Sequence, residues 1–421
     1  MNRESKTVAS LKGQLSKFSG IISKGVKKPK KRLIKEMLYG IQASKDVKLS
    51  NIARTLKEDQ PLIKTEDRLS RNLDDEDFTD SINDEICRLG ASKVTEDMVI
   101  AIDPGDLRKR YAKKMEFLSR VRDGSEKEIG EGYPLCKAVA ADIESKQVIP
   151  LYCEAYSFLS GEVKSENAQI LKMIDLLFKH LEGRGIHAID RGGDRGVLYQ
   201  KYLEEKKAKR FVIRLVDRDL IHQGRRRSCR DLAKMLPTPY ETVFIIYEGG
   251  KEKKRTLQYN ASPVKLPHYE HGLYLVVVKG FGIEPMMLLT SCTVKIRQKE
   301  SIWRIVEYYL ARWKCDESYR YIKQCYHLED IRVRSYVSIR NVVVLVLAVS
   351  YFASVYLGQN LKLKMLVERI FLVSKRFFGV PSFFNYAIAD GIFNLLYPDK
   401  IGLRGISYGR LDDFQLCFNF G

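Results

Sequence analysis

The sequence lacks the usual marks of a secreted or disulfide-bonded protein. Its eight cysteines are scattered between Cys87 and Cys417, without a Cys-x-x-Cys pair and without a Cys/His cluster at the spacing of metal ligands. This pattern argues against a disulfide framework and a zinc site, and it predicts reduced, buried thiols in a cytoplasmic protein. Residues Met1–Lys12 are polar, so no secretory signal is expected.

Long apolar runs and repeats are missing as well. The longest apolar run, Val342–Leu357, falls short of the roughly 20 residues that span a membrane, and we expect a buried core helix there. The sequence has no internal repeat and no low-complexity tract. Its 421 residues are enough for about two or three domains.

Acidic residues are clearly outnumbered by basic ones. The chain has 73 Lys and Arg against 53 Asp and Glu, a formal net charge of +20 and a pI near 9.4. A field of that sign attracts polyanions, and nucleic acid is the partner that we favour. An anionic membrane surface is the alternative, because charge alone does not name a partner.

The N-terminal region, residues 1–95, predicts a helical DNA-binding module. Residues 1–35 carry eleven Lys and Arg and a single acid. Three short helices follow, which are Lys35–Gln42, Leu49–Leu56 capped by Ser50, and Glu66–Leu73 capped by Thr65. The cations expected on their outer face are Lys48, Arg54, Lys57, Arg68 and Arg71. This arrangement resembles a helix-turn-helix module that reads a DNA groove, and an ordinary small helical bundle is the alternative.

From residue 96 to about 345 the pattern predicts a mixed α/β domain. Three strands in a meander and then two strands separated by helices are expected. The strands are Met98–Asp103, Leu135–Ile143, Gln147–Tyr156, Gly185–Asp190 and Arg210–Leu215, and the helices are Glu166–Leu181 and Arg195–Glu205. Residues 220–300 contain four further strand patterns with glycine turns, which predict a β-rich insertion. After Ile302 the sequence is helical.

Three acids stand out by their position. Asp103 and Asp190 each end a predicted strand just before a glycine-containing turn, at the sheet edge where open α/β folds place ligands. Asp316 lies on a later helix, predicted over Glu307–Lys323. At about 100° per residue, one stripe of this helix contains Tyr309, Arg312, Asp316, Arg320 and Lys323, and a neighbouring apolar stripe containing Tyr319 packs on the sheet.

The polar stripe has two interpretations. A surface helix with i,i+4 ion pairs explains its charges. A phosphate-binding face that carries one metal ligand also explains why three cations and the Tyr309 phenol surround a single acid, Asp316. We favour the second interpretation.

These motifs resemble those of the DDE transposases of prokaryotic insertion sequences, in the group called the IS-four family. The third acid of that family lies in a signature of Tyr, two residues, Arg, three residues, Glu, six residues and Lys, which this chain matches with Tyr309, Arg312, Asp316 and Lys323. The family's second acid lies in an Asp-Arg-Gly/Ala-x-Asp context, matched by Asp190–Asp194. The resemblance spans roughly residues 20–345, the β-rich insertion included.

The resemblance implies an RNase H-like catalytic domain that cuts and joins DNA. Asp103, Asp190 and Asp316 would hold two Mg²⁺ or Mn²⁺ ions about 3.5–4 Å apart, and Tyr309, Arg312, Arg320 and Lys323 would bind DNA phosphates. The partners would be transposon terminal inverted repeats and target DNA, bound by a homodimer associated with the nucleoid in the cytoplasm of a prokaryote.

The chain departs from the family at two points. It has Asp316 in place of Glu, followed by Glu317, which is the alternative third acid. The inserted strand also lacks the tryptophan with which some relatives grip a displaced base, and Phe281 or Tyr274 would be its substitute.

Two alternatives stay open at this point. A metal-dependent nuclease of the same fold would use the same acids without joining strands, and a catalytically impaired relative would only bind DNA. No Gly-Lys-Ser/Thr follows the Asp190 loop, which argues against nucleotide binding there.

The C-terminal region, 346–421, is apolar and helical. Core packing is the first interpretation of this region, and a dimer interface is the second.

Overall fold

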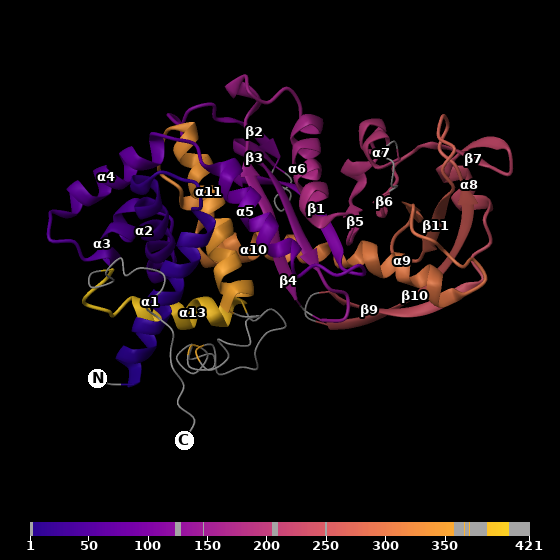
Figure 1. Ribbon diagram of the computed structural model, residues 1–421. Coiled ribbons are helices and arrows are strands. Elements are labelled where there is room, and N and C mark those ends of the chain that lie inside the picture. The colour runs from indigo at the N-terminus through magenta and orange to yellow at the C-terminus, as the bar shows by residue number, and fades with distance from the viewer. Residues whose placement is uncertain are drawn as a thin grey trace. The chain divides into compact units, whose positions relative to one another are not determined.

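The computed structural model describes residues 3–122, 128–145, 147–203, 209–248, 251–357 and 385–403, together with residues 366 and 370 (Figure 1). The chain folds into two units that interleave along the sequence. Unit 1 comprises Met1–Ile86, Leu107–Tyr133 and Arg320–Gly421, and unit 2 comprises Cys87–Asp106 and Pro134–Tyr319. The predicted domains, by contrast, are three consecutive segments of the chain, residues 1–95, 96–345 and 346–421. They stay predictions.

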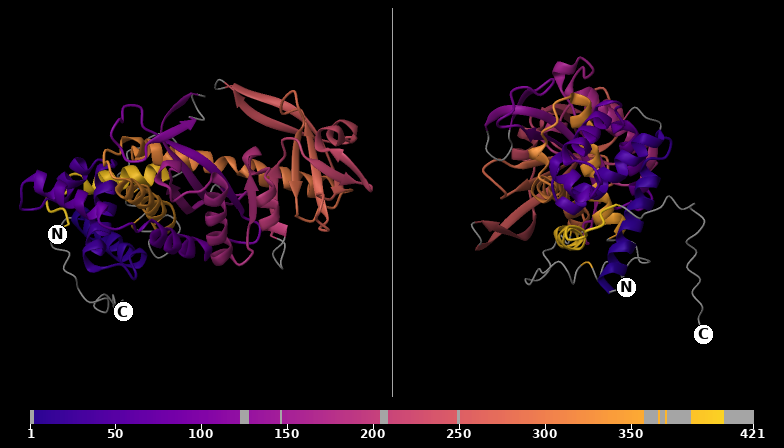
Figure 2. Two further views of the ribbon diagram at one scale, coloured as in Figure 1. Left: turned by 90° about the horizontal axis from the view of Figure 1, so that it is seen from above. Right: turned by 90° about the vertical axis from the view of Figure 1, so that its left-hand side faces the viewer.

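Unit 1 is built mainly from helices. Those described are α1 (Arg3–Ile22), α2 (Lys28–Ser44), α3 (Leu49–Leu56), α4 (Leu62–Asp74), α5 (Thr79–Ala91, whose end belongs to unit 2), α11 (Tyr336–Tyr351) and α13 (Asn385–Leu396). In α2, Leu33, Met37 and Ile41 recur at helical spacing and are all buried. Helix α2 contacts α1, α3, α4, α11 and α13, so it forms the centre of this bundle (Figures 1 and 2).

The apolar run near the C-terminus forms a core helix, as the sequence predicts. Helix α11 and the π-helical turn that follows it, Phe352–Leu357, give one helix that is long and apolar enough to cross a membrane by length and composition. However, 89% of its apolar window is buried inside the protein. Part of the predicted C-terminal helical region, Leu361–Phe378, lies outside the described residues, whereas Phe383–Tyr397 corresponds to α13.

The described strands form a mixed sheet, which confirms the predicted α/β class. The ten strands are β1 (Val99–Arg108), β2 (Ser119–Arg122), β3 (Ile129–Ala141), β4 (Val148–Ala155), β5 (Ile186–Ile189), β6 (Phe211–Arg214), β9 (Tyr240–Glu248), β10 (Lys251–Val264), β11 (Leu273–Lys279) and β12 (Met286–Thr290). Their order is β2-β3-β1-β5-β6-β12-β11-β10-β9, with β4 beside β3. β1, β5 and β6 run parallel to one another, and β12 joins β6 antiparallel.

Helices cover the sheet of unit 2. α9 (Lys299–Ala311) packs against β5, β6, β10, β11 and β12, and its Ile302, Ile305 and Val306 join the main core cluster. The other described helices are α6 (Glu166–Leu181), α7 (Gly196–Leu203), α8 (Cys229–Met235) and α10 (Trp313–Cys325), and unit 2 ends within α10 at Tyr319. A separate two-stranded ribbon, β7 (Asp219–His222) and β8 (Arg225–Ser228), stands apart from the main sheet.

Several predicted elements match the observed ones, while two predicted caps are wrong. The helices Leu49–Leu56 and Glu166–Leu181 and the strand Leu273–Lys279 have the predicted bounds. Ser50 and Thr65 do not cap their helices, because Lys48 and Pro61 occupy the N-cap positions and make no side-chain cap hydrogen bond. The seven described cysteines are free and buried, as predicted.

We expect Asn341→Ala to destabilise unit 1. The fully buried Asn341 amide donates to the carbonyl oxygens of Leu73 and Glu76, and its oxygen accepts from the Phe78 amide N–H. Losing these partners should lower the free energy of unfolding by about 1–3 kcal/mol, measured by urea denaturation. Asn72→Ala, which removes a bond within one helix turn, is the control and should cost clearly less. Equal effects would contradict this role of Asn341.

Candidate active site

Two of the predicted acids lie side by side because two strands run parallel. β1 and β5 pair with Ile102 opposite Ile189, so the next residues, Asp103 and Asp190, lie beside each other. β5 ends at Ile189, whereas β1 continues to Arg108, so the prediction that the strand ends at Asp103 is wrong. The isoleucines before the two acids are buried. The two aspartate side chains are only partly covered, with 17% and 42% of their surface exposed.

The helix that carries the third acid is interrupted, which corrects the prediction of one helix over Glu307–Lys323. Helix α9 ends at Ala311, and α10 begins at Trp313. Arg312 lies between them with a right-handed backbone. Its N–H bonds to the Tyr309 carbonyl oxygen, three residues back, and its own carbonyl oxygen accepts from Cys315. The chain is therefore wound more tightly at this point, and a regular helical wheel does not apply across it.

The Arg312 guanidinium reaches all three predicted acids. Its Nη1 lies 3.4 Å from Asp103 Oδ1 and 3.6 Å from Asp316 Oδ2, and its Nη2 lies 3.9 Å from Asp190 Oδ2. Only 8% of the Arg312 side chain is exposed, and its buried Nε has no hydrogen-bond partner in the structure. The structure thus brings the three acids to one buried cation.

Burial controls the charge of this cluster. It raises the pKa of Asp103 from 3.8 to about 8; Arg312 opposes the rise, while the charge of Asp316 and a hydrogen bond with it add to the rise. Burial also disfavours the charged Arg312, but attraction by Asp103 and its neighbours outweighs this and raises the pKa of Arg312 above its ordinary value. If all three carboxylates were ionised, one guanidinium would leave net negative charge that a further cation could balance.

The oxygen donors suit a hard divalent cation. Mg²⁺ is commonly bound through one or two carboxylates together with water and substrate phosphates, and the Asp103 and Asp316 carboxyl groups lie 3.4 and 3.6 Å from the same atom, Arg312 Nη1. In the described part of the chain, no group of three or more His, Cys, Asp and Glu side chains is arranged to hold a metal ion. In their ionised form the carboxyl groups of Asp103 and Asp316 fit one Mg²⁺ that takes its remaining ligands elsewhere, and Asp190 would have to approach them.

Tyr309 and Arg214 support Asp190 from the side of the sheet. The Tyr309 hydroxyl lies 3.4 Å from Asp190 Oδ1, and Arg214 Nη1 lies 3.5 Å from the same hydroxyl. Arg214 is the last residue of β6, which pairs parallel with β5. The sequence analysis missed Arg214, although a cation at the end of the next predicted strand was a usable signal.

Tyr319 fixes the peptide of Asp103, a role that sequence reasoning also missed. Its hydroxyl donates to the Asp103 carbonyl oxygen at 3.0 Å. Its ring is so close to Gly105 that a Cβ atom there would lie 2.8 Å from the ring. The ammonium group of Lys137, a buried residue of β3, lies 4.5 Å from the centre of the same ring. A buried cation in a predicted apolar strand gives no pattern from which this contact could be predicted.

The turn after Asp190 is held by close packing and by Asp194. A Cβ atom at Gly193 would lie 2.5 Å from Ile189 Cγ2, so the turn can pack here only with glycine. Asp194 is nearly fully buried and accepts from Arg218 Nε at 2.5 Å and from the Val216 N–H at 2.9 Å. Asp194 is thus committed to holding the turn, which leaves Asp190 as the acid available for chemistry.

The remaining predicted site residues lie elsewhere in the fold. Glu317, the alternative third acid, and Arg320 are exposed. Arg320 and Lys323 belong to unit 1, where Lys323 Nζ pairs with Glu329 at 2.9 Å. Phe281 and Tyr274, the suggested base-gripping residues, are partly buried against the main core cluster.

Two of the cations predicted on the outer face of the N-terminal module are used internally. Arg68 pairs with Glu36 and Glu58, and Lys48 pairs with Asp330; about a fifth of each side chain is exposed. This corrects the prediction that they face outward. Those that do are Arg54, Lys57 and Arg71 of the same set, and Lys27, Lys28 and Lys31 before or within the start of α2.

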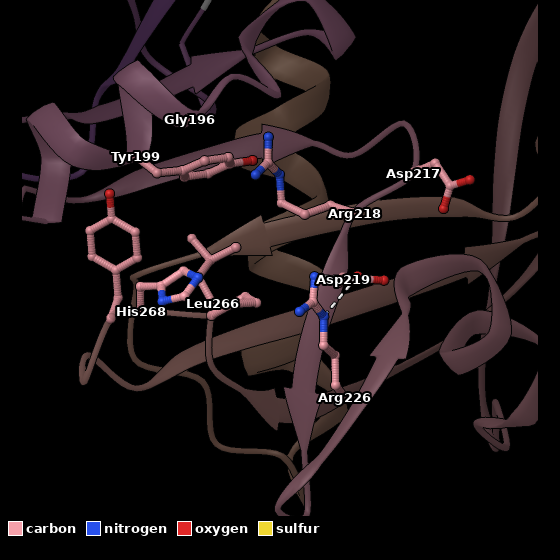
Figure 3. Close-up of a pocket in the computed structure, with 10 residues that line it drawn as sticks. Gly196, Tyr199, Asp217, Arg218, Asp219, Arg226, Leu266 and His268 are labelled. Carbon is pink, nitrogen blue, oxygen red and sulfur yellow. Dashed lines mark hydrogen bonds and ion pairs between the residues drawn. The ribbon is translucent and has the colours of Figure 1, made fainter.

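A cavity of about 440 Å³ lies elsewhere in unit 2, and its lining includes none of the predicted acids. Figure 3 shows Tyr199 and Arg218 along it, with Arg226 and its partner Asp219 next to them. The Arg218 guanidinium lies 4.8 Å from the centre of the Tyr199 ring and already pairs with Asp194, so this part of the lining belongs to the support of the Asp190 turn.

Comparisons with known proteins give a distant structural likeness. No family model and no curated protein matches the chain. Among solved structures, the chain is similar to a piggyBac transposase in a synaptic complex with hairpin DNA, with 11% sequence identity and a TM-score of 0.38. The likeness covers 84% of this chain and 59% of that chain, so the chain spans less than two thirds of its length. So distant a likeness does not establish a family, and the predicted membership stays a prediction.

The pKa of Asp103 predicts how stability depends on pH. Because the folded-state pKa of about 8 exceeds the ordinary 3.8, the folded protein binds a proton that the unfolded chain has released between about pH 4 and about pH 8. The contribution of Asp103 to stability is therefore largest below this window and declines as pH rises through it. Asp103→Asn should flatten that part of the curve in urea denaturation at a series of pH values. An unchanged slope in this variant would contradict the assignment.

Proposed function

We propose that this protein is a DDE-type transposase that cleaves DNA at transposon ends and joins the freed 3′-hydroxyl to target DNA. One observation carries the proposal: acids from β1, from the end of β5 and from α10 meet at one buried guanidinium, that of Arg312. Three carboxylates gathered around one point are the kind of donor set that phosphodiester chemistry with divalent ions uses. The net charge of +20 supports a DNA substrate.

The proposed fold assignment is an RNase H-like core with an insertion. The strand order β4-β3-β1-β5-β6, with Asp103 within β1 and Asp190 directly after the neighbouring parallel strand β5, supports this assignment. Strands β9, β10, β11 and β12 extend the same sheet and correspond to the proposed β-rich insertion between the second and third acids. The helices at the N-terminus would be the module that recognises DNA ends, and the protein would act as a homodimer in the prokaryotic cytoplasm.

In this proposal, each residue of the candidate site has its own role. Asp103, Asp190 and Asp316 would hold Mg²⁺ or Mn²⁺, which when bound activates the attacking hydroxyl and stabilises the leaving oxygen. Arg312, released from carboxylates that then bind metal, would pair with a DNA phosphate through its planar guanidinium. Tyr309 would keep Asp190 in position, and Tyr319 would do the same for the Asp103 peptide.

A second candidate is a relative that binds DNA but has lost its chemistry. Two observations favour it: the third acid is Asp316 where the resembling family has Glu, and no ready-made group of three metal-binding side chains is present in the described residues. A nuclease that cuts without joining would differ from the transposase in the second chemical step. Incubation with the DNA flanking its own gene and Mg²⁺ separates the three, because only the transposase gives both cut and joined products.

We expect Asp103→Ala and Asp190→Ala each to abolish cleavage while leaving the affinity for DNA ends nearly unchanged. Each change removes a proposed metal ligand and leaves the cationic surfaces intact. Cleavage is measured on a labelled transposon-end duplex, and binding by fluorescence anisotropy. Asp175→Ala, at an exposed acid paired with Lys201, is the matched control and should cleave normally. Activity above a few percent in either site variant would overturn the metal-ligand assignment.

Asp316 and Glu317 can be distinguished directly. Both residues are exposed on neighbouring positions of α10, and Asp316 differs from Glu317 by its contact with Arg312 at 3.6 Å. We therefore expect Asp316→Ala to lose cleavage by at least about 100-fold, as for a metal ligand, and Glu317→Ala to keep it. Asp316→Glu should cleave at least as fast as the natural protein. If Glu317→Ala is the inactive variant, Asp316 is not the third acid.

A further inference from the structure

The β7–β8 ribbon concentrates positive charge at one exposed place in unit 2. Residues 225–234 contain five cations and a single acid. Arg225, Arg226, Arg230 and Lys234 are exposed, and Arg227 is partly exposed. None of these residues contacts Asp103, Asp190 or Asp316, and neither the predicted N-terminal module nor the proposed active site accounts for them.

The ribbon is built firmly enough to present these cations in a defined position. Its turn residues, Gln223 and Gly224, both have positive φ (49° and 74°), which is the pattern of the tight type I′ hairpin turn. At its middle, Ile221 and Lys265 exchange two backbone hydrogen bonds of 2.8 and 2.9 Å. At its base, the Cys229 N–H donates to the Arg218 carbonyl oxygen at 2.8 Å. A ligand would therefore meet cations whose backbone is already ordered, which lowers the entropic cost of binding.

Only part of this charge is balanced within the protein. Arg226 pairs with Asp219 at 2.8 Å beside the cavity of Figure 3, and Arg230 lies 3.7 Å from Asp217. Among the described residues, Arg225, Arg227 and Lys234 have no carboxylate partner. Like charges held this close together repel one another and destabilise the fold. An anionic partner that binds there would remove this repulsion.

We propose that the β7–β8 ribbon is a second DNA-binding surface, which holds the sugar–phosphate backbone of duplex DNA on the unit that carries the three acids. Arginine is well suited to bind phosphate, because its planar guanidinium can donate two parallel hydrogen bonds to the phosphate oxygens, whereas a point charge cannot. A two-stranded ribbon has the width that the DNA major groove admits. Because DNA is taken as the partner, this inference rests on the proposed function.

Salt-dependent binding to a labelled duplex of random sequence tests the ribbon directly. The variant combines Arg225→Gln, Arg227→Gln and Lys234→Gln. Each lost phosphate contact should lower the slope of log K against log salt by about 0.9, so the triple variant should lose a slope of about 2–3 and at least about tenfold in affinity. Lys93, Lys164 and Lys295, all exposed in unit 2, are changed to Gln together as a control with the same loss of charge.

The outcomes separate the ribbon from the proposed chemistry. A triple variant that binds like the control overturns the ribbon assignment and leaves the proposed function standing. A natural protein that does not cleave, but binds duplex DNA through the ribbon, overturns only the proposed chemistry. Arg225→Lys with Arg227→Lys keeps the charge and should therefore keep the salt slope of the natural protein, and a slope as low as that of the Gln variant would overturn the assignment of phosphate contacts to these charges. An effect on duplex RNA alone would overturn DNA as the partner.

Discussion

The buried guanidinium of Arg312 is the contact on which the candidate site depends. A buried cation is costly unless carboxylates surround it, and removing one partner of such a group leaves uncompensated charge. Here Asp103, Asp190 and Asp316 come from three different elements and meet only at Arg312. The three acids therefore form one electrostatic unit with Arg312, and the loss of any one carboxylate leaves this buried cation with fewer opposite charges.

The framework around this unit is fixed by the sheet rather than by the charges. The parallel register of β1 and β5 sets Asp103 and Asp190 at one edge, and Gly193 and Asp194 hold the turn after Asp190. Tyr319 bonds the peptide of Asp103 from α10. Backbone contacts thus hold the positions of Asp103 and Asp190. Under the proposed function, their side chains would exchange Arg312 for a metal ion while the backbone stays in place, and such preorganisation is what electrostatic catalysis requires.

The sequence predicted the parts of this site that follow from periodicity. Apolar runs before Asp103 and Asp190 indicated the two parallel strands, although β1 continues past Asp103 to Arg108, and the alternation of strands and helices indicated the mixed sheet. The interruption at Arg312 was not predicted, because no proline or glycine marks it and the contacts of Arg312 with three acids exist only in the folded chain. Lys48 and Arg68 were assigned to the surface for the same reason: their carboxylate partners Asp330, Glu36 and Glu58 are recognisable only in the folded chain.

Asp316 reaches the buried guanidinium although its side chain is one methylene shorter than that of glutamate. Its Oδ2 lies 3.6 Å from Arg312 Nη1, four residues earlier in the chain, while 49% of the side chain stays exposed. The charge of Asp316 also contributes to the raised pKa of Asp103, so the two carboxyl groups lie close enough to interact. The weaker point of the site is Asp190, whose 3.9 Å contact with Arg312 is the longest of the three.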